Sequence, residues 1–219
     1  MKILGCCLLF FTAFSLHAAE PFYSAQVGTQ VWLGEIRGSG ERSDPSNVPS
    51  LSFAFEHGFP LLPNLSLRYT NLAERDLAYD ALSYTLYYRL IEKPFIGLDT
   101  GITLSRFRNG EYLGVDDRTY EFDDNSVSFY TYGEIGLPYL PLMLFGQVNA
   151  SNYGSRALEY QDLSLGLKWL VPIQAGDLSL HTGYRNSHLE LNELSLRETV
   201  NDPQTIKISG WFVGVAMTF

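Results

Sequence analysis

Apolar and polar residues alternate along most of this chain with a period of two. The segment 82–90, LSYTLYYRL, places Leu or Tyr at every even position and Ser, Thr, Tyr or Arg at the odd positions. A period of two is typical of a β-strand with one apolar face. Comparable runs lie near residues 23–33, 51–56, 65–70, 96–104, 127–137, 142–151, 162–169, 178–185 and 211–219. The pattern therefore predicts an all-β protein of about ten strands.

The connections between these runs are of two kinds. Short segments that contain proline, near 60–63, 94, 138–141 and 172–177, alternate with longer polar segments near 35–49, 72–79, 106–126, 153–160 and 189–206. Proline donates no hydrogen bond to a strand ladder, so it is suited to places where a strand ends. Short turns on one side and long loops on the other are typical of outer-membrane barrels.

We therefore expect residues 20–219 to form a transmembrane antiparallel up-and-down β-barrel, with short periplasmic turns and long external loops. Each run is close to the roughly nine to eleven residues that a tilted strand needs to cross a bilayer. A soluble lipocalin-like barrel or sandwich is the alternative, and it would turn its apolar face inward.

Residues 1–19 have the layout of a secretory signal peptide. A positive start at Met1-Lys2 precedes the apolar run 3–14 and the small residues of SLHAAEP. We expect cleavage after Ala18 or Ala19 and a location in the outer membrane of a Gram-negative bacterium. The chain's two cysteines lie in this leader, which excludes disulfides, thiolate metal sites and cysteine nucleophiles from the mature part.

The last predicted strand and a segment near residue 60 carry a resemblance to known proteins. Alternating large residues end the chain, namely Trp211, Val213, Val215, Met217 and Phe219. This ending resembles that of Gram-negative outer-membrane proteins, in which a C-terminal strand ending in Phe is the signal for the barrel-assembly machinery. FEHGFPLLPNLSLRYTNL together with LSYTLYYRL resembles a family of small outer-membrane β-barrel proteins named for a Gly-Gly signature. The resemblance implies a barrel in the outer membrane without an established activity, although this chain has no Gly-Gly pair.

Charged residues on the polar faces are expected to point into the barrel. This set is Glu56, Arg68, Arg89, Asp99, Glu134, Asp162, Lys168 and Arg185, so the predicted lumen is neutral. Glu56 and Arg68 are equidistant from Leu62, and Arg89 and Asp99 from Pro94. We expect each pair to lie directly opposite across a turn, where unlike charges attract. A ten-stranded barrel that also contains Trp32, Tyr87, Tyr130 and Tyr132 is expected to be mostly plugged.

The excess negative charge lies in the predicted external loops. The richest is RNGEYLGVDDRTYEFDDN, with the candidate calcium or magnesium ligands Asp116, Asp117, Glu121, Asp123 and Asp124. Their spacing is not that of an EF-hand, and a solvated acidic loop facing lipopolysaccharide and its divalent cations is the alternative. A net charge of −9 argues against nucleic acid. Lipopolysaccharide and membrane lipid are the expected partners, with the assembly machinery during biogenesis.

Catalytic candidates are few. His57, His181 and His188 are the histidines outside the leader, and only His188, beside Ser187 and near Glu190, is placed for hydrolysis at the barrel mouth. Adjacent residues of a strand point to opposite faces, so Ser187 and His188 cannot pair unless the strand has ended before them. The Asp-x-His of omptin-type proteases and any nucleotide-binding glycine motif are missing.

We therefore expect a non-enzymatic structural or surface-interaction role, without a cofactor. The alternatives are a porin-like channel for small solutes, which would need charges that line an open path, and a surface hydrolase.

Overall fold

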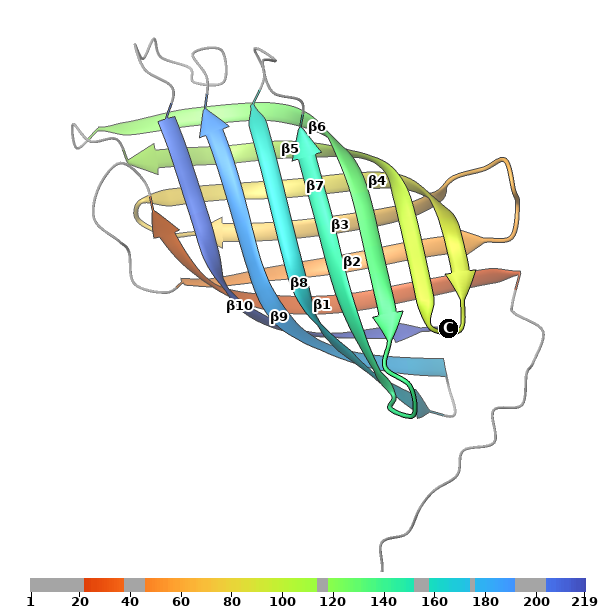
Figure 1. The fold of residues 1–219 in the computed structure, drawn as a ribbon. Coiled ribbons are helices and arrows are strands. Elements are labelled where there is room, and N and C mark those ends of the chain that lie inside the picture. The colour runs from red at the N-terminus through yellow and green to blue at the C-terminus, as the bar shows by residue number, and fades with distance from the viewer. Residues whose placement is uncertain (1–21, 38–45, 114–117, 152–157, 174–175, 192–203) are drawn as a thin grey trace, which may run out of the picture.

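The computed structural model describes residues 22–37, 46–113, 118–151, 158–173, 176–191 and 204–219. These residues form ten strands that close into one antiparallel barrel (Figure 1). Their bounds are β1 Tyr23–Arg37, β2 Ser46–His57, β3 Asn64–Ala73, β4 Leu77–Lys93, β5 Ile96–Leu113, β6 Thr119–Gly136, β7 Leu142–Ser151, β8 Glu159–Ile173, β9 Gly176–Leu191 and β10 Gln204–Thr218. The predicted all-β, up-and-down barrel of about ten strands is confirmed.

Each strand pairs with its neighbours in sequence, and β1 closes the barrel by pairing with β10. We call one end of the barrel the turn end. It carries the connections 58–63, 94–95 and 137–141 and the adjoining ends of β8 and β9. The backbone of Phe219 exchanges hydrogen bonds with Ala25 at this end, at 2.9 and 3.2 Å. The opposite end, where β1, β3, β5, β7 and β9 end and the strands that follow them begin, is the loop end.

The outer surface of the barrel is apolar from the turn end to about the level of Trp211 and Tyr184, in the middle of β10 and β9. Large side chains there keep a substantial exposed area, among them Val27, Leu51, Leu86, Ile102, Val127, Phe129, Leu165, Trp169, Trp211 and Val213. The alternation found in the sequence thus has its apolar face outward, which is the reverse of a soluble barrel. Among the described residues, no helix is long and apolar enough to cross a membrane.

Most strands continue farther toward the loop end than the sequence predicts. The expected loop at 106–126 is for the most part the paired ends of β5 and β6, and the expected loop at 72–79 shrinks to the connection 74–76. The many charged residues in these segments are typical of loops. In the structure the charges alternate with buried apolar side chains such as Phe107 and Phe122, both 1% exposed.

A β-bulge in β5 explains why the period of two was hard to follow there. The pairing with β6 shifts by one residue between Phe107 and Gly110, and Asn109 has a positive φ of 51°. One extra residue exchanges the two faces of a strand. As a result Tyr112, and not Glu111, lies buried inside the barrel beyond the bulge.

Candidate functional site

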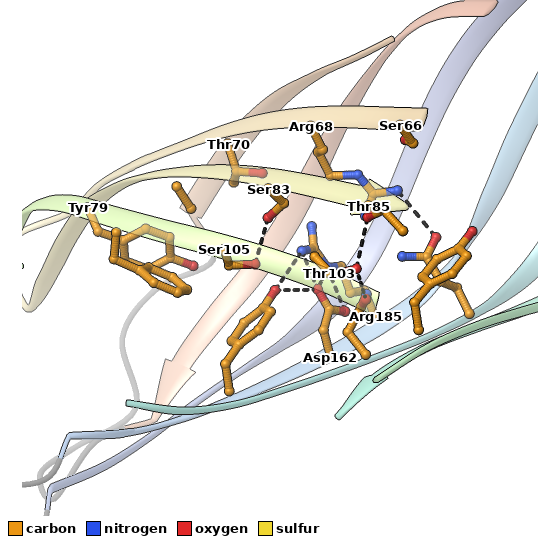
Figure 2. Close-up of a pocket in the computed structure, with 16 residues that line it drawn as sticks. Ser66, Arg68, Thr70, Tyr79, Ser83, Thr85, Thr103, Ser105, Asp162 and Arg185 are labelled. Atoms are coloured by element: carbon orange, nitrogen blue, oxygen red, sulfur yellow. Dashed lines mark hydrogen bonds and ion pairs between the residues drawn. The ribbon is translucent and has the colours of Figure 1, made fainter. Parts of the chain in front are cut away.

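The barrel interior has three zones along its axis. A polar chamber of about 220 Å³ lies toward the turn end, and a smaller one of about 40 Å³ follows it (Figure 2). The two chambers share Ser66, Arg68, Tyr130 and Gln147 in their walls. Apolar side chains fill the barrel beyond them, toward the loop end.

These apolar side chains form one buried cluster, which we call the plug. Its fully buried members include Ile36, Val48, Leu72, Leu77, Phe107, Phe122, Leu158, Leu191, Ile206 and Ile208. They come from nearly every strand, so the cluster spans the cross-section of the barrel. A mostly plugged lumen is predicted from the sequence on the basis of aromatic and charged residues, whereas the structure closes the loop-end part with this apolar cluster.

The larger chamber contains a cluster of charges around Arg89. Arg89 Nη2 donates to Glu56 Oε1 at 2.5 Å, and Arg89 Nε donates to Asp99 Oδ1 at 3.2 Å. The hydroxyl of Tyr87 donates to the same Glu56 oxygen at 2.8 Å. The structure therefore brings together Arg89 and Asp99, which are direct cross-strand partners in β4 and β5.

The predicted direct pairing of Glu56 with Arg68 is wrong. Arg68 lies opposite Ser52, because the β2–β3 register is centred on Pro60 instead of Leu62. The centre of the β2–β3 pairing thus lies two residues closer to β2 than the sequence predicts. The Glu56 side chain contacts Arg89 of β4 instead. Arg68 Nη2 donates to Gln147 Oε1 at 3.3 Å across the lumen.

A second charged pair lies on the opposite wall of the same chamber. Lys168 of β8 contacts the carboxylate of Glu134 of β6, bridging over the intervening strand β7. The hydroxyl of Tyr132 donates to Glu134 Oε2 at 2.7 Å and lies 3.3 Å from Lys168 Nζ. Each charge in this group therefore has a partner.

The smaller chamber is bounded by the most buried ion pair of the described residues. Arg185 is 4% and Asp162 3% exposed, and Arg185 donates through Nε at 3.0 Å and Nη2 at 2.5 Å to Asp162. Tyr160 donates its hydroxyl to the same carboxylate at 2.6 Å. The guanidinium carbon of Arg185 lies 4.5 Å from the ring centre of Trp32, a cation–π contact. Figure 2 shows Asp162, Arg185 and Arg68 around this chamber.

The structure describes three of the five candidate metal ligands, and these three are not assembled into a metal site. Asp116 and Asp117 lie outside the described residues, whereas Glu121, Asp123 and Asp124 belong to β6. Within the described part of the chain, no group of three acidic, histidine or cysteine side chains is arranged to hold a metal ion. Asp123 instead accepts a hydrogen bond from the backbone of Asn109 at 2.9 Å, and Asp124 accepts one from the backbone of Leu158 at 3.1 Å.

The hydrolase candidates are separated by the strand geometry. Ser187 is buried inside the barrel at 2% exposure, while the neighbouring His188 lies on the outer face of β9 and is half-buried. His181 lies opposite Lys168 in the register and packs against Phe145 and Phe212. None of these side chains forms a nucleophile–base pair with another.

The predicted assembly signal lies on the outer face of the closing strand. Trp211, Val213 and Phe219 are 64%, 57% and 58% exposed, and the alternating positions Val215 and Met217 are half-buried. The signalling role of these residues stays a prediction.

No family model matches the chain, and no curated protein matches it. Among solved structures, Neisserial surface protein A matches with 13% identity and a TM-score of 0.43 over 91% of this chain and 98% of that chain. The translocator domain of the autotransporter NalP from Neisseria meningitidis matches with 12% identity and a TM-score of 0.43, covering 93% and 91%. The outer membrane protease OmpT from Escherichia coli matches with 9% identity and a TM-score of 0.38, covering 90% and 94%. Likenesses at this level identify no family and assign no activity, and the Gly-Gly family resemblance stays a prediction.

Proposed function

We propose that this chain is an integral outer-membrane β-barrel with a closed interior, and that its role is structural or surface-interactive. The proposed location rests on the outward apolar surface, which would be in contact with water if the barrel were not in a membrane. Soluble monomers rarely show such large continuous apolar areas. Aromatic side chains at two levels, Phe59, Phe95 and Tyr139 near the turn end and Tyr184 and Trp211 nearer the loop end, resemble the girdles of membrane barrels.

We infer the closed interior from a change in which face of the strands is apolar, which occurs between the turn end and the loop end. Near the turn end, apolar residues face outward and charges face inward. Near the loop end the arrangement is the opposite, because Arg37, Asp80, Arg106, Asn125 and Lys207 lie on the outside and the plug fills the inside. We infer that the loop-end part projects beyond the bilayer as a small water-exposed domain with its own apolar core.

This projecting part is where a surface interaction would take place. Its outer face is polar and exposed, and it is continuous with the acidic segments of the chain. A barrel that crosses the membrane and ends in a closed, folded cap offers a rigid surface to lipopolysaccharide or to a partner protein. Divalent cations bound between acidic side chains and lipid phosphates would support such contacts.

Single-channel conductance in a planar bilayer tests the closed interior. We expect no discrete current steps from protein whose folding is verified by heat-modifiable gel mobility. We expect brief openings from a double variant, Phe107→Ser with Phe122→Ser, because it removes two large members of the plug. Phe129→Ser, on the outward face of β6, is the matched control and should stay silent. Regular steps from the folded wild-type barrel would make the porin-like alternative the leading function.

A further inference from the structure

We propose that the small chamber beside Arg68 and Arg185 binds a chloride-sized monovalent anion. The chamber's volume is about 40 Å³, which is room for about three water molecules. That space accommodates one halide ion but not a metabolite. Figure 2 shows that both arginines approach this space from different strands, Arg68 from β3 and Arg185 from β9.

The charges around the chamber do not balance. The charged side chains in its wall are Arg68, Arg185 and Asp162, which leaves one positive charge in excess. Asp162 is fully engaged by Arg185 and Tyr160. Arg68 contacts Gln147, and among the described residues it forms no ion pair with a carboxylate. Arg68 is half-buried, and a charge that is partly removed from water without a counter-charge is costly.

The remaining negative charge of the lumen is not in contact with Arg68. Glu56 and Asp99 share Arg89 in the large chamber, and Arg89 also contacts the exposed Glu92, so the negative charge of that cluster is held around Arg89. Glu134 is occupied by Lys168. An anion that enters the small chamber would neutralise Arg68 directly.

Unsatisfied donors are also present. Arg185 Nη1 is buried and has no hydrogen-bond partner, although the side chain lines the chamber. Ser83 and Ser105 share one hydrogen bond at 2.8 Å, so one of the two hydroxyl protons stays available. Donors without acceptors favour an anion over a cation, and two guanidinium groups favour it over water alone.

The position of Arg68 also provides an access route. Arg68 lines both chambers, and the large chamber reaches toward the turn end, where Glu56 and Arg89 side chains remain 27% and 31% exposed. The plug closes the other direction. An anion would therefore enter from the turn-end side and remain beside Arg68.

Bromide tests the site, because it replaces chloride and scatters anomalously. Crystals of the full barrel grown or soaked in sodium bromide should show an anomalous peak within hydrogen-bond distance of Arg68 and Arg185. In solution, the thermal unfolding midpoint should be a few degrees higher in sodium bromide or chloride than in sodium gluconate at equal ionic strength. Arg68→Gln should abolish this difference.

Arg106→Gln is the matched control, because Arg106 is an exposed arginine on the outer face of β5. It should keep the full halide response. A crystal without an anomalous peak in the chamber would overturn the proposal, as would an equal halide response in wild type and Arg68→Gln. The crystallographic experiment uses the wild-type protein, so it tests for the anion site even if Arg68→Gln does not fold. Failure here would leave the closed-barrel proposal untouched, because that is tested by conductance.

Discussion

Asp162 is the residue whose loss should damage the barrel most, since it neutralises the buried guanidinium of Arg185. Asp162→Asn removes that charge and leaves Arg185 and Arg68 close together without a carboxylate. Breaking a buried pair in this way costs about 3–5 kcal/mol of unfolding free energy. Urea unfolding in lipid vesicles, followed by tryptophan fluorescence, measures the loss.

Asp177→Asn is the control for this comparison. Asp177 is an exposed carboxylate at the start of β9 near the turn end, and it should change the unfolding free energy by less than about 0.5 kcal/mol. Similar losses for the two variants would show that the Asp162–Arg185 pair contributes no special stability.

The contact between Glu134 and Lys168 allows a charge-reversal test at the same scale. Lys168→Glu places two carboxylates beside the Tyr132 hydroxyl and should destabilise the barrel. Adding Glu134→Lys restores an attractive pair. A double-mutant cycle should therefore give a coupling energy of about 1–3 kcal/mol. If the double variant is no more stable than Lys168→Glu alone, the two side chains do not interact in the folded protein.

Among the elements, β5 depends most on a local backbone feature. At the bulge, a Cβ added to Gly110 would lie 2.4 Å from the carbonyl oxygen of Phe122 and 2.6 Å from its ring. Gly110→Ala should therefore displace Phe122 from the plug and cost about 1–3 kcal/mol. The midpoint of thermal or urea unfolding measures this cost.

Gly133 of β6 provides the matched substitution. A Cβ at Gly133 meets its nearest neighbour, Leu98 Cδ1, only at 3.9 Å, so Gly133→Ala should be close to neutral. Equal destabilisation by both substitutions would mean that the general conformational cost of replacing glycine, and not the bulge, sets the effect.

The elements also show how far a sequence of this type can be interpreted. The strand segments with an outward apolar face were predictable, because their apolar residues recur without interruption from Leu82 to Leu90 and from Trp211 to Phe219. The Arg89–Asp99 pair was predicted from its symmetry about Pro94, but the pairing next to the turn is centred between Pro94 and Phe95, and a register shift between Arg89 and Ile91 brings the two residues opposite each other. The centre of the β2–β3 connection could not, because several residues of 58–63 are equally suited to a turn.

The plug was the main feature that the sequence did not reveal. Its residues are interleaved with charged residues in segments such as 106–126, and the extra residue at the β5 bulge exchanges the two faces midway. Charge density alone makes such a segment look like a loop. The signal that would have found it is the inverted alternation, in which Phe107 and Phe122 occupy inward positions while Arg106 and Asn125 point outward.

For the whole molecule, the reversal of polarity divides the outer surface into an apolar part, which we propose faces lipid, and a polar part, and the boundary between them is testable. Ile102 is an outward residue of β5 with 59% exposure, and it lies opposite Phe129 in the apolar part of the surface. An arginine near the middle of the bilayer costs a membrane barrel about 2–4 kcal/mol, and the cost falls to about 0–1 kcal/mol near the interface. Ile102→Arg should therefore lower the unfolding free energy in lipid vesicles by the larger amount.

Asn125 supplies the comparison, because it lies on the outer face of the neighbouring strand, opposite Arg106, just beyond the apolar surface. Asn125→Arg should cost at most about 1 kcal/mol, since the side chain is already in water or at the interface. The two positions share strand pairing and outward orientation, and the bound of about 1 kcal/mol at Asn125 includes the repulsion between the new arginine and Arg106, so a larger cost at Ile102 reports depth in the membrane. A small cost at both positions would show that lipid does not cover the surface around Ile102, and the proposed membrane location would then fail. A large cost at both would instead move the membrane boundary toward the loop end and bury the part of the barrel that we assign to surface interaction.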